Sequence, residues 1–241
     1  VNGVLNIDGD STIKAMRILG AGKIVVDATG MSAGDEISLT ANLANFTGTL
    51  ETVGNDDLEA SIVDGKIVLS AKPVAKIGDT NYETLADAFA AAQDGDTITL
   101  LGDCELVSGI DIDKDITVDG AGYKVYAADI ADDTEMFNIR SKVTITNLTF
   151  DADHKFSYGI QVQNDADVTL SDVSILYAGN DNWGAAVNLN NGKLFVSGDF
   201  TAFSGGENGG AFPFTGILYW SGEFKFADGV TASIADPTGA T

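Results

Sequence analysis

The chain has 241 residues, 44% of them hydrophobic, which supplies a folded core and argues against global disorder. Its 36 acidic residues outnumber 13 Lys and Arg, and the formal charge of -23 opposes binding to nucleic acid or anionic lipid. No apolar run approaches the roughly 20 residues of a membrane span, and we expect the chain to begin after any signal peptide.

The composition favours short strands joined by tight turns. There are 28 glycines and only three prolines, with many Asp and Asn residues. The single cysteine, Cys104, excludes an internal disulfide and lies beside an apolar run, so we expect a buried small side chain and not a nucleophile.

The first 75 residues contain apolar strands about 20 residues apart, in VLNIDGDSTIKAMRI and GKIVVDATG. They end in LEASIVDGKIVLSA, in which Asp64 and Gly65 form the preferred two-residue turn of a hairpin. We interpret residues 1–75 as the last coils and closing hairpin of one module.

One stretch, TNYETLADAFAAAQDGD, predicts a helix over about 82–93, with Thr80 or Asn81 as its N-cap. Its apolar stripe consists of Leu85, Ala88, Phe89 and Ala92. The strand-like DGDTITLL follows at once. We therefore expect this helix to cover the open end of a coil and to start a second module, residues 76–241.

Short alternating segments then recur along the chain. They start at Ile116, Val143, Val168, Leu194 and Phe224, at spacings of 27, 25, 26 and 30 residues. Alternation gives each strand one apolar face, with a change of phase at Asn147 or a bend beyond it. A recurrence of 20 to 30 residues is the mark of a solenoid, in which each coil covers the apolar face of its neighbour.

Further glycine-led strands lie between these segments, which gives two or three strands per coil. Longer loops are expected at Asp133 to Glu135, Asp151 to Phe156, Tyr177 to Trp183 and Ser204 to Phe212. An antiparallel sandwich stays open as an alternative. We predict an all-β fold, a right-handed parallel β-helix solenoid with one short capping helix.

The segment KIGDTNYETLADAFAAAQDGDTITLLGD, which begins at Lys76, and the coils after it resemble pectate-lyase-like parallel β-helix modules of Gram-positive bacterial surface proteins. The resemblance covers roughly residues 76–241. It implies the architecture more specifically than the activity, because this superfamily holds both polysaccharide-cleaving enzymes and inert adhesin stalks.

A polysaccharide lyase of this fold needs calcium-binding carboxylates and a positioned Arg or Lys base. Arg140 and Lys142 are the candidates, but no compact carboxylate cluster lies near them in the sequence. A solvated strand end is the competing interpretation.

A hydrolase of this fold relies on two or three aspartates around the scissile bond. Asp151 and Asp153 with His154, or the pair Asp132 and Asp133, are the candidates. The Gly-His-Gly and Arg-Ile-Lys motifs of such hydrolases are absent from the sequence, and its one histidine suits a loop better than a metal cluster or serine triad.

Calcium is the one cofactor considered. Asp111, Asp113 and Asp115 alternate as in a calcium loop, but Ile116 and Gly122 stand where that motif has glycine and glutamate. The simpler interpretation exposes these carboxylates on a strand, without a cofactor.

Aromatic side chains could stack on sugar rings. Trp183 and Tyr177 are the candidate ligand contacts, and Tyr219 and Trp220 belong to the same group. At strand spacing, core positions are the better interpretation for Phe195, Phe200, Phe224 and Phe226.

We therefore expect a non-catalytic structural or adhesive segment of a secreted, cell-surface bacterial protein, with a polysaccharide lyase or glycoside hydrolase as the alternative. The expected partners are copies of the chain, in tandem or head to tail, and a glycan or host protein. Reading Phe224 on to Val4 of a following copy gives a spacing of 21 residues, which keeps the coil rhythm.

Overall fold

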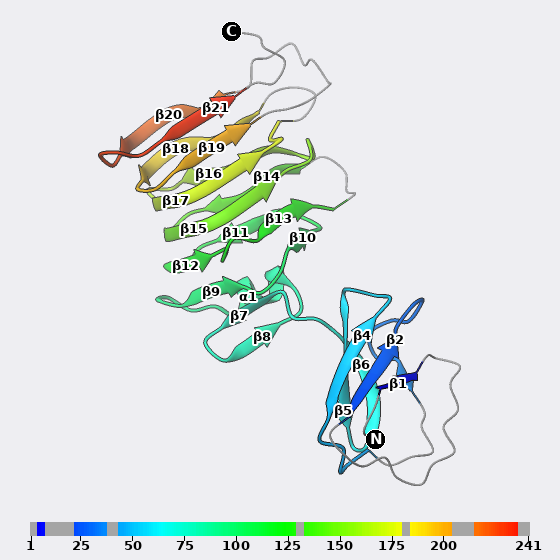
Figure 1. The fold of residues 1–241 in the computed structure, drawn as a ribbon. Coiled ribbons are helices and arrows are strands. Elements are labelled where there is room, and N and C mark those ends of the chain that lie inside the picture. Colours follow the sequence, from blue (N-terminus) through cyan, green and yellow to red (C-terminus); the bar gives the residue numbers. More distant parts are fainter. Residues whose placement is uncertain are drawn as a thin grey trace. The chain divides into compact units, whose positions relative to one another are not determined.

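The structure is a computed structural model and describes residues 4–7, 22–37, 43–128, 133–179, 184–203 and 215–235. The chain divides into two compact units, Val1–Lys72 and Pro73–Thr241 (Figure 1). The predicted fold class is confirmed: parallel coils stack into a β-helix of about seven turns with one short helix. The described part of the chain contains no helix long and apolar enough to cross a membrane.

The first unit combines a parallel and an antiparallel three-stranded sheet. The parallel sheet has the order β1-β2-β4, and the antiparallel sheet has the order β3-β6-β5. The bounds are β1 (Val4–Ile7), β2 (Lys23–Asp27), β3 (Glu36–Ile37), β4 (Thr49–Val53), β5 (Leu58–Val63) and β6 (Lys66–Ala71). The two sheets share a small core around Ile24, Val26 and Ile67, which are fully buried.

The predicted hairpin of the first unit is present as β5 and β6. Asp64 and Gly65 both have positive φ, 49° and 79°, as the right-handed twist of a two-residue hairpin requires. The interpretation of this unit as the last coils of another β-helix stays a prediction.

The second unit is the β-helix itself. Its first elements are β7 (Ala75–Ile77), β8 (Thr80–Tyr82), α1 (Leu85–Ala91), β9 (Thr97–Leu100), β10 (Cys104–Leu106), β11 (Ile110–Ile112) and β12 (Ile116–Asp119). The stack continues with β13 (Lys124–Ala127), β14 (Asp133–Ile139), β15 (Lys142–Asp151), β16 (Phe156–Gln163), β17 (Asp167–Leu176), β18 (Ala185–Val196), β19 (Phe200–Phe203), β20 (Thr215–Phe226) and β21 (Ala232–Ala235).

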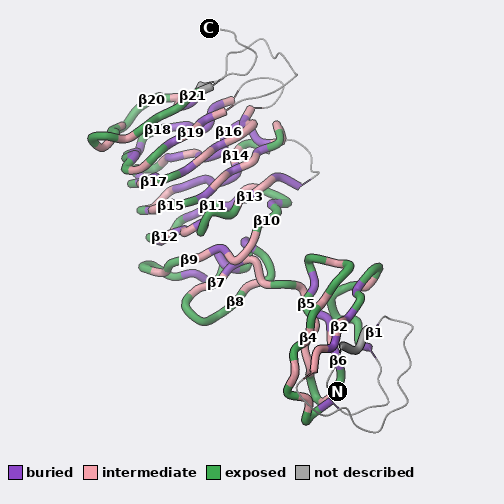
Figure 2. The backbone as a smooth tube through the Cα atoms, in the orientation of Figure 1, coloured by how far each residue is buried: buried purple, intermediate pink, exposed green. Residues whose placement is uncertain are grey.

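Parallel pairing in register places inward side chains of successive coils above one another on three walls. The first column contains Val118, Ile145, Leu170, Val196 and Phe226. The second contains Ile112, Ile139, Val162, Leu189 and Tyr219, and the third Val125, Phe150, Ile175, Ala202 and Ile234. Nearly all of these side chains are fully buried except in the last coil (Figure 2). Each buried large side chain stabilises the stack by about 1.5–3 kcal/mol.

The predicted change of phase at Asn147 is confirmed. Asn147 has a φ of 51°, and Asp172 repeats this left-handed conformation one coil later with a φ of 57°. Asn and Asp adopt this conformation at lower cost than most residues. The bend carries β15 and β17 from one wall to the next, so Ile145 and Leu148 both face the core.

The single helix closes the first coil, but it is shorter than predicted. It spans Leu85–Ala91 and is capped by Thr84, whose Oγ1 accepts a hydrogen bond from Asp87 N at 3.1 Å. Thr80 and Asn81, predicted as caps, instead belong to β8, which pairs antiparallel with β7. Buried Phe89 meets Phe137 edge to face at 5.2 Å, so the helix does cover core side chains.

One corner of the coil varies in length. Its connections join β10 to β11, β13 to β14, β15 to β16, β17 to β18 and β19 to β20. Three residues separate Leu106 from Ile110, whereas eleven separate Phe203 from Thr215. The expected loop at Asp133 to Glu135 is wrong, because these residues begin β14 and pair with β16.

The Thr84 cap supports a direct test. Thr84→Ala removes an acceptor of an otherwise unpaired helix N–H, and we expect a loss of about 1 kcal/mol in the free energy of unfolding. Thr80→Ala is the matched control, because exposed Thr80 lies in β8 and caps nothing. Urea unfolding followed by circular dichroism measures both variants. Equal losses in the two variants would contradict the assignment of the cap.

Candidate functional site

Several charged candidates on the β-helix lie within or beside residues 111–115. Asp111 belongs to β11, and residues 113–115 follow this strand. Ile110 and Ile112 face the core and Asp111 faces outward. In register on the next strand, Phe137 and Ile139 face the core and Asn138 lies beside Asp111. Arg140 follows directly, where the chain leaves β14 for β15. The coil period therefore brings residues 27 and 29 positions apart into contact.

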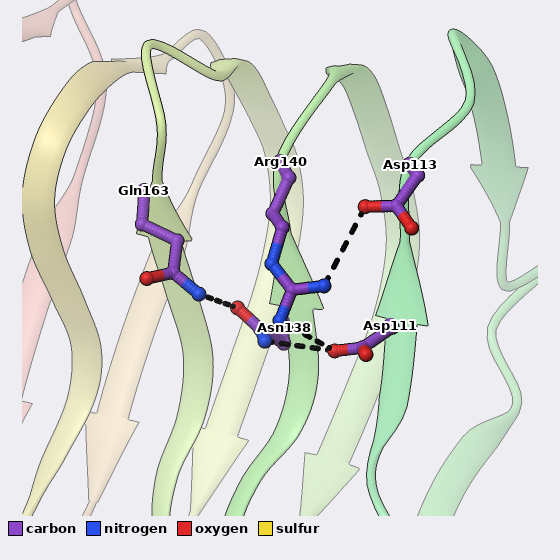
Figure 3. Close-up of polar contacts among 5 residues, drawn as sticks. All are labelled: Asp111, Asp113, Asn138, Arg140 and Gln163. Carbon is purple, nitrogen blue, oxygen red and sulfur yellow. Dashed lines mark hydrogen bonds and ion pairs between the residues drawn. The ribbon is translucent and has the colours of Figure 1, made fainter.

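Arg140 pairs with two of the aspartates (Figure 3). Its guanidinium lies 3.1 Å from Asp111 Oδ1 and 3.6 Å from Asp113 Oδ1. The arginine side chain is 31% exposed and the two aspartates 59% and 65%, so solvent screens these ion pairs substantially. The three residues join two neighbouring coils.

Amide side chains extend this contact along the same wall. Asn138 Nδ2 donates to Asp111 Oδ1 at 2.8 Å, and Gln163 Nε2 donates to Asn138 Oδ1 at 2.6 Å (Figure 3). Farther along, Asn188 Nδ2 donates to Gln161 Oε1 at 2.9 Å. Each of these donors points toward the preceding coil, and Asn138 is 4% exposed. We call Asp111, Asp113, Asn138, Arg140 and Gln163 the Arg140 cluster.

The remaining residues of the segment hold other parts of the first coils. Lys114 Nζ donates to the carbonyl oxygens of Phe89 and Ala90 at 3.1 and 3.0 Å, where a cation suits the C-terminal end of α1. Asp115 accepts hydrogen bonds from Ser141 Oγ and Lys142 N. These bonds, that of Ser141 first, lower the pKa of Asp115 below its ordinary value.

The candidate calcium ligands are thus engaged by protein groups. Asp111 and Asp113 face Arg140, whereas Asp115 faces Ser141 and the start of β15. Across the described residues, no group of three or more His, Cys, Asp or Glu side chains is arranged to hold a metal ion. A calcium contact at these carboxylates stays a prediction.

The candidate hydrolase residues lie at another corner. Asp151 ends β15 and pairs in register with Leu176, and Asp153 is exposed with a φ of 42°. His154 Nδ1 lies 3.0 Å from the carbonyl oxygen of Gly179. Within the described chain, no ion pair or hydrogen bond joins Arg140 to Asp151 or Asp153. Asp133 lies in β14, and Asp132 falls outside the described residues.

The aromatic candidates separate into buried and exposed positions. Tyr177 lies edge to face between His154 and Phe203, at 5.7 and 5.5 Å, and Trp183 falls outside the described residues. Phe200 is buried as expected. The expected core positions of Phe195 and Phe226 are wrong, because these side chains are 39% and 44% exposed.

Two different causes explain these exposures. Phe195 pairs with Lys225 and Thr169 on the outer face of its wall. Side chains alternate along the strand, and this alternation turns Phe195 outward although it is hydrophobic. Phe226 is in an inward column but belongs to the last described coil, where no further strand covers it. Phe224 is partly buried in that same coil.

Cys104 is confirmed as a buried side chain, 1% exposed. Burial, with the nearby Asp103 carboxylate as the smaller cause, raises the pKa of its thiol to about 12. A thiol held in the protonated form is a poor nucleophile. This cysteine therefore fills space between the first coils.

Sequence reasoning missed the amide side chains that extend the ion pairs of Arg140 along the wall. Asp111, Asn138 and Gln161 occupy equivalent outward positions, and Asn188 follows 27 residues after Gln161. The signal was available as polar residues repeating at the coil period. Reading it needs the register of each strand pair, which the spacing of strand starts defines only to within a few residues.

Replacing Arg140 tests the cluster. Arg140→Met removes two ion pairs between coils, and we expect the free energy of unfolding to fall by about 1 kcal/mol. Lys225→Met is the control: Lys225 lies 3.9 Å from Glu223 and is 72% exposed, so we expect a loss below about 0.5 kcal/mol. Urea unfolding measures both. A loss for Lys225→Met as large as that for Arg140→Met would show that the cluster adds nothing specific.

The pKa of Asp115 supplies a second test. Because folding lowers this pKa, its stabilising contribution is present above about pH 3.8 and is lost as pH falls through the folded value. Ser141→Ala removes the main cause, so we expect the pKa of Asp115 to rise toward 3.8, measured by carboxyl ¹³C NMR titration. Ser171→Ala should leave the Asp115 titration unchanged. An unaltered titration in Ser141→Ala would refute the role of this bond.

Comparison with protein-family models, with curated proteins and with solved structures found no match to this chain. The parallel β-helix is established by the structure itself, and the arrangement of its side chains indicates which functions it can support.

Proposed function

We propose that the chain is a non-catalytic structural and adhesive segment of a secreted bacterial surface protein. The observation that carries this proposal is the continuity of the three inward columns through successive coils. A stack of coils in constant register is a stiff element, because bending it would separate buried apolar side chains from their neighbours.

The charged candidates support the structural role. The guanidinium of Arg140 is engaged by the carboxylates of Asp111 and Asp113, which come from the preceding coil. Lys114 and Asp115 likewise contact the helix end and the next strand. These side chains hold adjacent coils together in the arrangement described.

The surface location is supported by composition. The chain is strongly acidic, with a formal charge of -23. Its one cysteine is buried, so the described residues expose no thiol that an oxidising environment would attack. In this proposal the chain is a pectate-lyase-like module of the adhesin type, and the loops at the corner of variable length contact a glycan or a host protein. Trp183 and Tyr177 are the proposed contact residues.

A search for cleavage activity tests this function. Purified chain is incubated with pectin, alginate and neutral plant and bacterial polysaccharides, with and without calcium, and unsaturated and reducing ends are measured. We expect no release above the protein-free blank. Release that is lost in Arg140→Met or Asp151→Ala, and kept in Lys225→Met, would overturn the proposal in favour of a lyase or hydrolase.

A further inference from the structure

The far end of the β-helix exposes its core. The last residues of the three columns, Phe226, Tyr219 and Ile234, are 44%, 55% and 57% exposed. One coil earlier, the same columns hold Val196, Leu189 and Ala202, each 0% exposed. Trp220, next to Tyr219, is 60% exposed. Figure 2 shows the same change from buried to exposed between β18 and β20.

The backbone of this coil is also open. Within the described residues, β20 pairs with β18 alone and β21 pairs with β19 alone. The opposite end of the β-helix differs, because α1 covers core side chains there and β7 pairs antiparallel with β9. At the far end, a further parallel strand can therefore be added beyond β20 and β21.

The first unit offers a matching edge. Its strands β1, β2 and β4 are parallel, and among the described residues β1 has β2 as its one partner. In the order β1-β2-β4, each strand lies one step beyond the previous one, as β20 lies beyond β18. The free edge of β1 can therefore pair in parallel with the free edge of β20.

We propose that the β20–β21 end of one copy binds the β1 edge of a second copy by parallel strand addition, so that copies join head to tail. This inference rests on the proposed structural function and names its partner, a second copy of this chain. The four-residue strand β1 pairs along one wall of this coil, and the unit that carries it lies over the exposed end that includes Phe226, Tyr219 and Ile234. Each joined copy again presents an open β20–β21 end, so growth does not close.

The charge of the chain sets the conditions for this association. Two copies that each carry -23 repel one another, whereas the contact itself consists of apolar side chains and backbone groups. Added salt screens the repulsion and strengthens apolar burial. We expect assembly to increase with both protein and sodium sulfate concentration.

Sedimentation velocity and negative-stain electron microscopy test the contact on the full chain. We expect linear oligomers that lengthen with concentration. Ile234→Lys, the tail variant, should weaken association at least tenfold, because a charge enters the joined core. Val107→Lys is the control, since Val107 is 70% exposed but lies between β10 and β11, far along the stack from β20. Circular dichroism verifies that both variants fold.

A mixing experiment tests the head-to-tail polarity. The tail variant keeps its own β1 edge, so it can add to an open β20–β21 end but cannot be extended. A small fraction of tail variant in wild-type protein should therefore shorten the oligomers in proportion to its amount. If the variant stays outside the oligomers, or if wild type stops at dimers, head-to-tail joining is overturned.

The same samples separate this inference from the function on which it rests. A wild-type chain that stays monomeric at high concentration in sulfate overturns the joining of copies, while an absence of polysaccharide cleavage leaves the structural function standing. Cleavage of a polysaccharide overturns the structural function whatever the size of the oligomers.

Discussion

Stacking of inward apolar side chains between neighbouring parallel strands is the interaction on which this β-helix depends. Each coil is too thin to enclose a core by itself, so its Val, Ile, Leu and Phe side chains are buried only when coils lie above and below them. Columns such as Val118, Ile145 and Leu170 require a constant register. The left-handed residues at the bends, Asn147 and Asp172, keep that register while the chain changes wall.

The polar contacts follow from the same register. Because equivalent positions repeat at the coil period, an outward Asp111 lies beside Asn138, and Arg140 reaches back to the preceding coil. The segment 111–115 then joins three elements, since Lys114 holds the end of α1 and Asp115 holds the start of β15. The charged side chains of this segment, which in the sequence suggested a calcium site, thus connect neighbouring coils.

The sequence was sufficient to predict the fold, because alternating apolar residues and their recurrence determine which faces must be buried. The Asp64–Gly65 pair predicted the hairpin, and the alternation predicted the bend at Asn147. Prediction failed where pairing of distant backbone segments overrides a local signal: Thr80 and Asn81 resemble helix caps, yet β8 pairs with β7. The predicted burial of Phe226 was also wrong. Alternation predicts that this side chain faces inward, but it does not predict whether a further strand covers it.

The partners of Arg140 lay beyond prediction for a related reason. Strand starts at irregular spacings leave each register uncertain by one or more residues, and a shift of one residue turns a side chain to the opposite face. Only the paired strands establish that Asp111 and Asn138 are neighbours.

The corner of variable length divides this architecture into a constant and a changeable part. Strands on the three walls cannot gain a residue without turning apolar side chains outward, whereas the connection before β20 is eleven residues long and that before β11 only three. Evolution can therefore lengthen or replace these connections with little cost to stability. One scaffold could in this way diversify the surface on one side while its interior stays under strict selection.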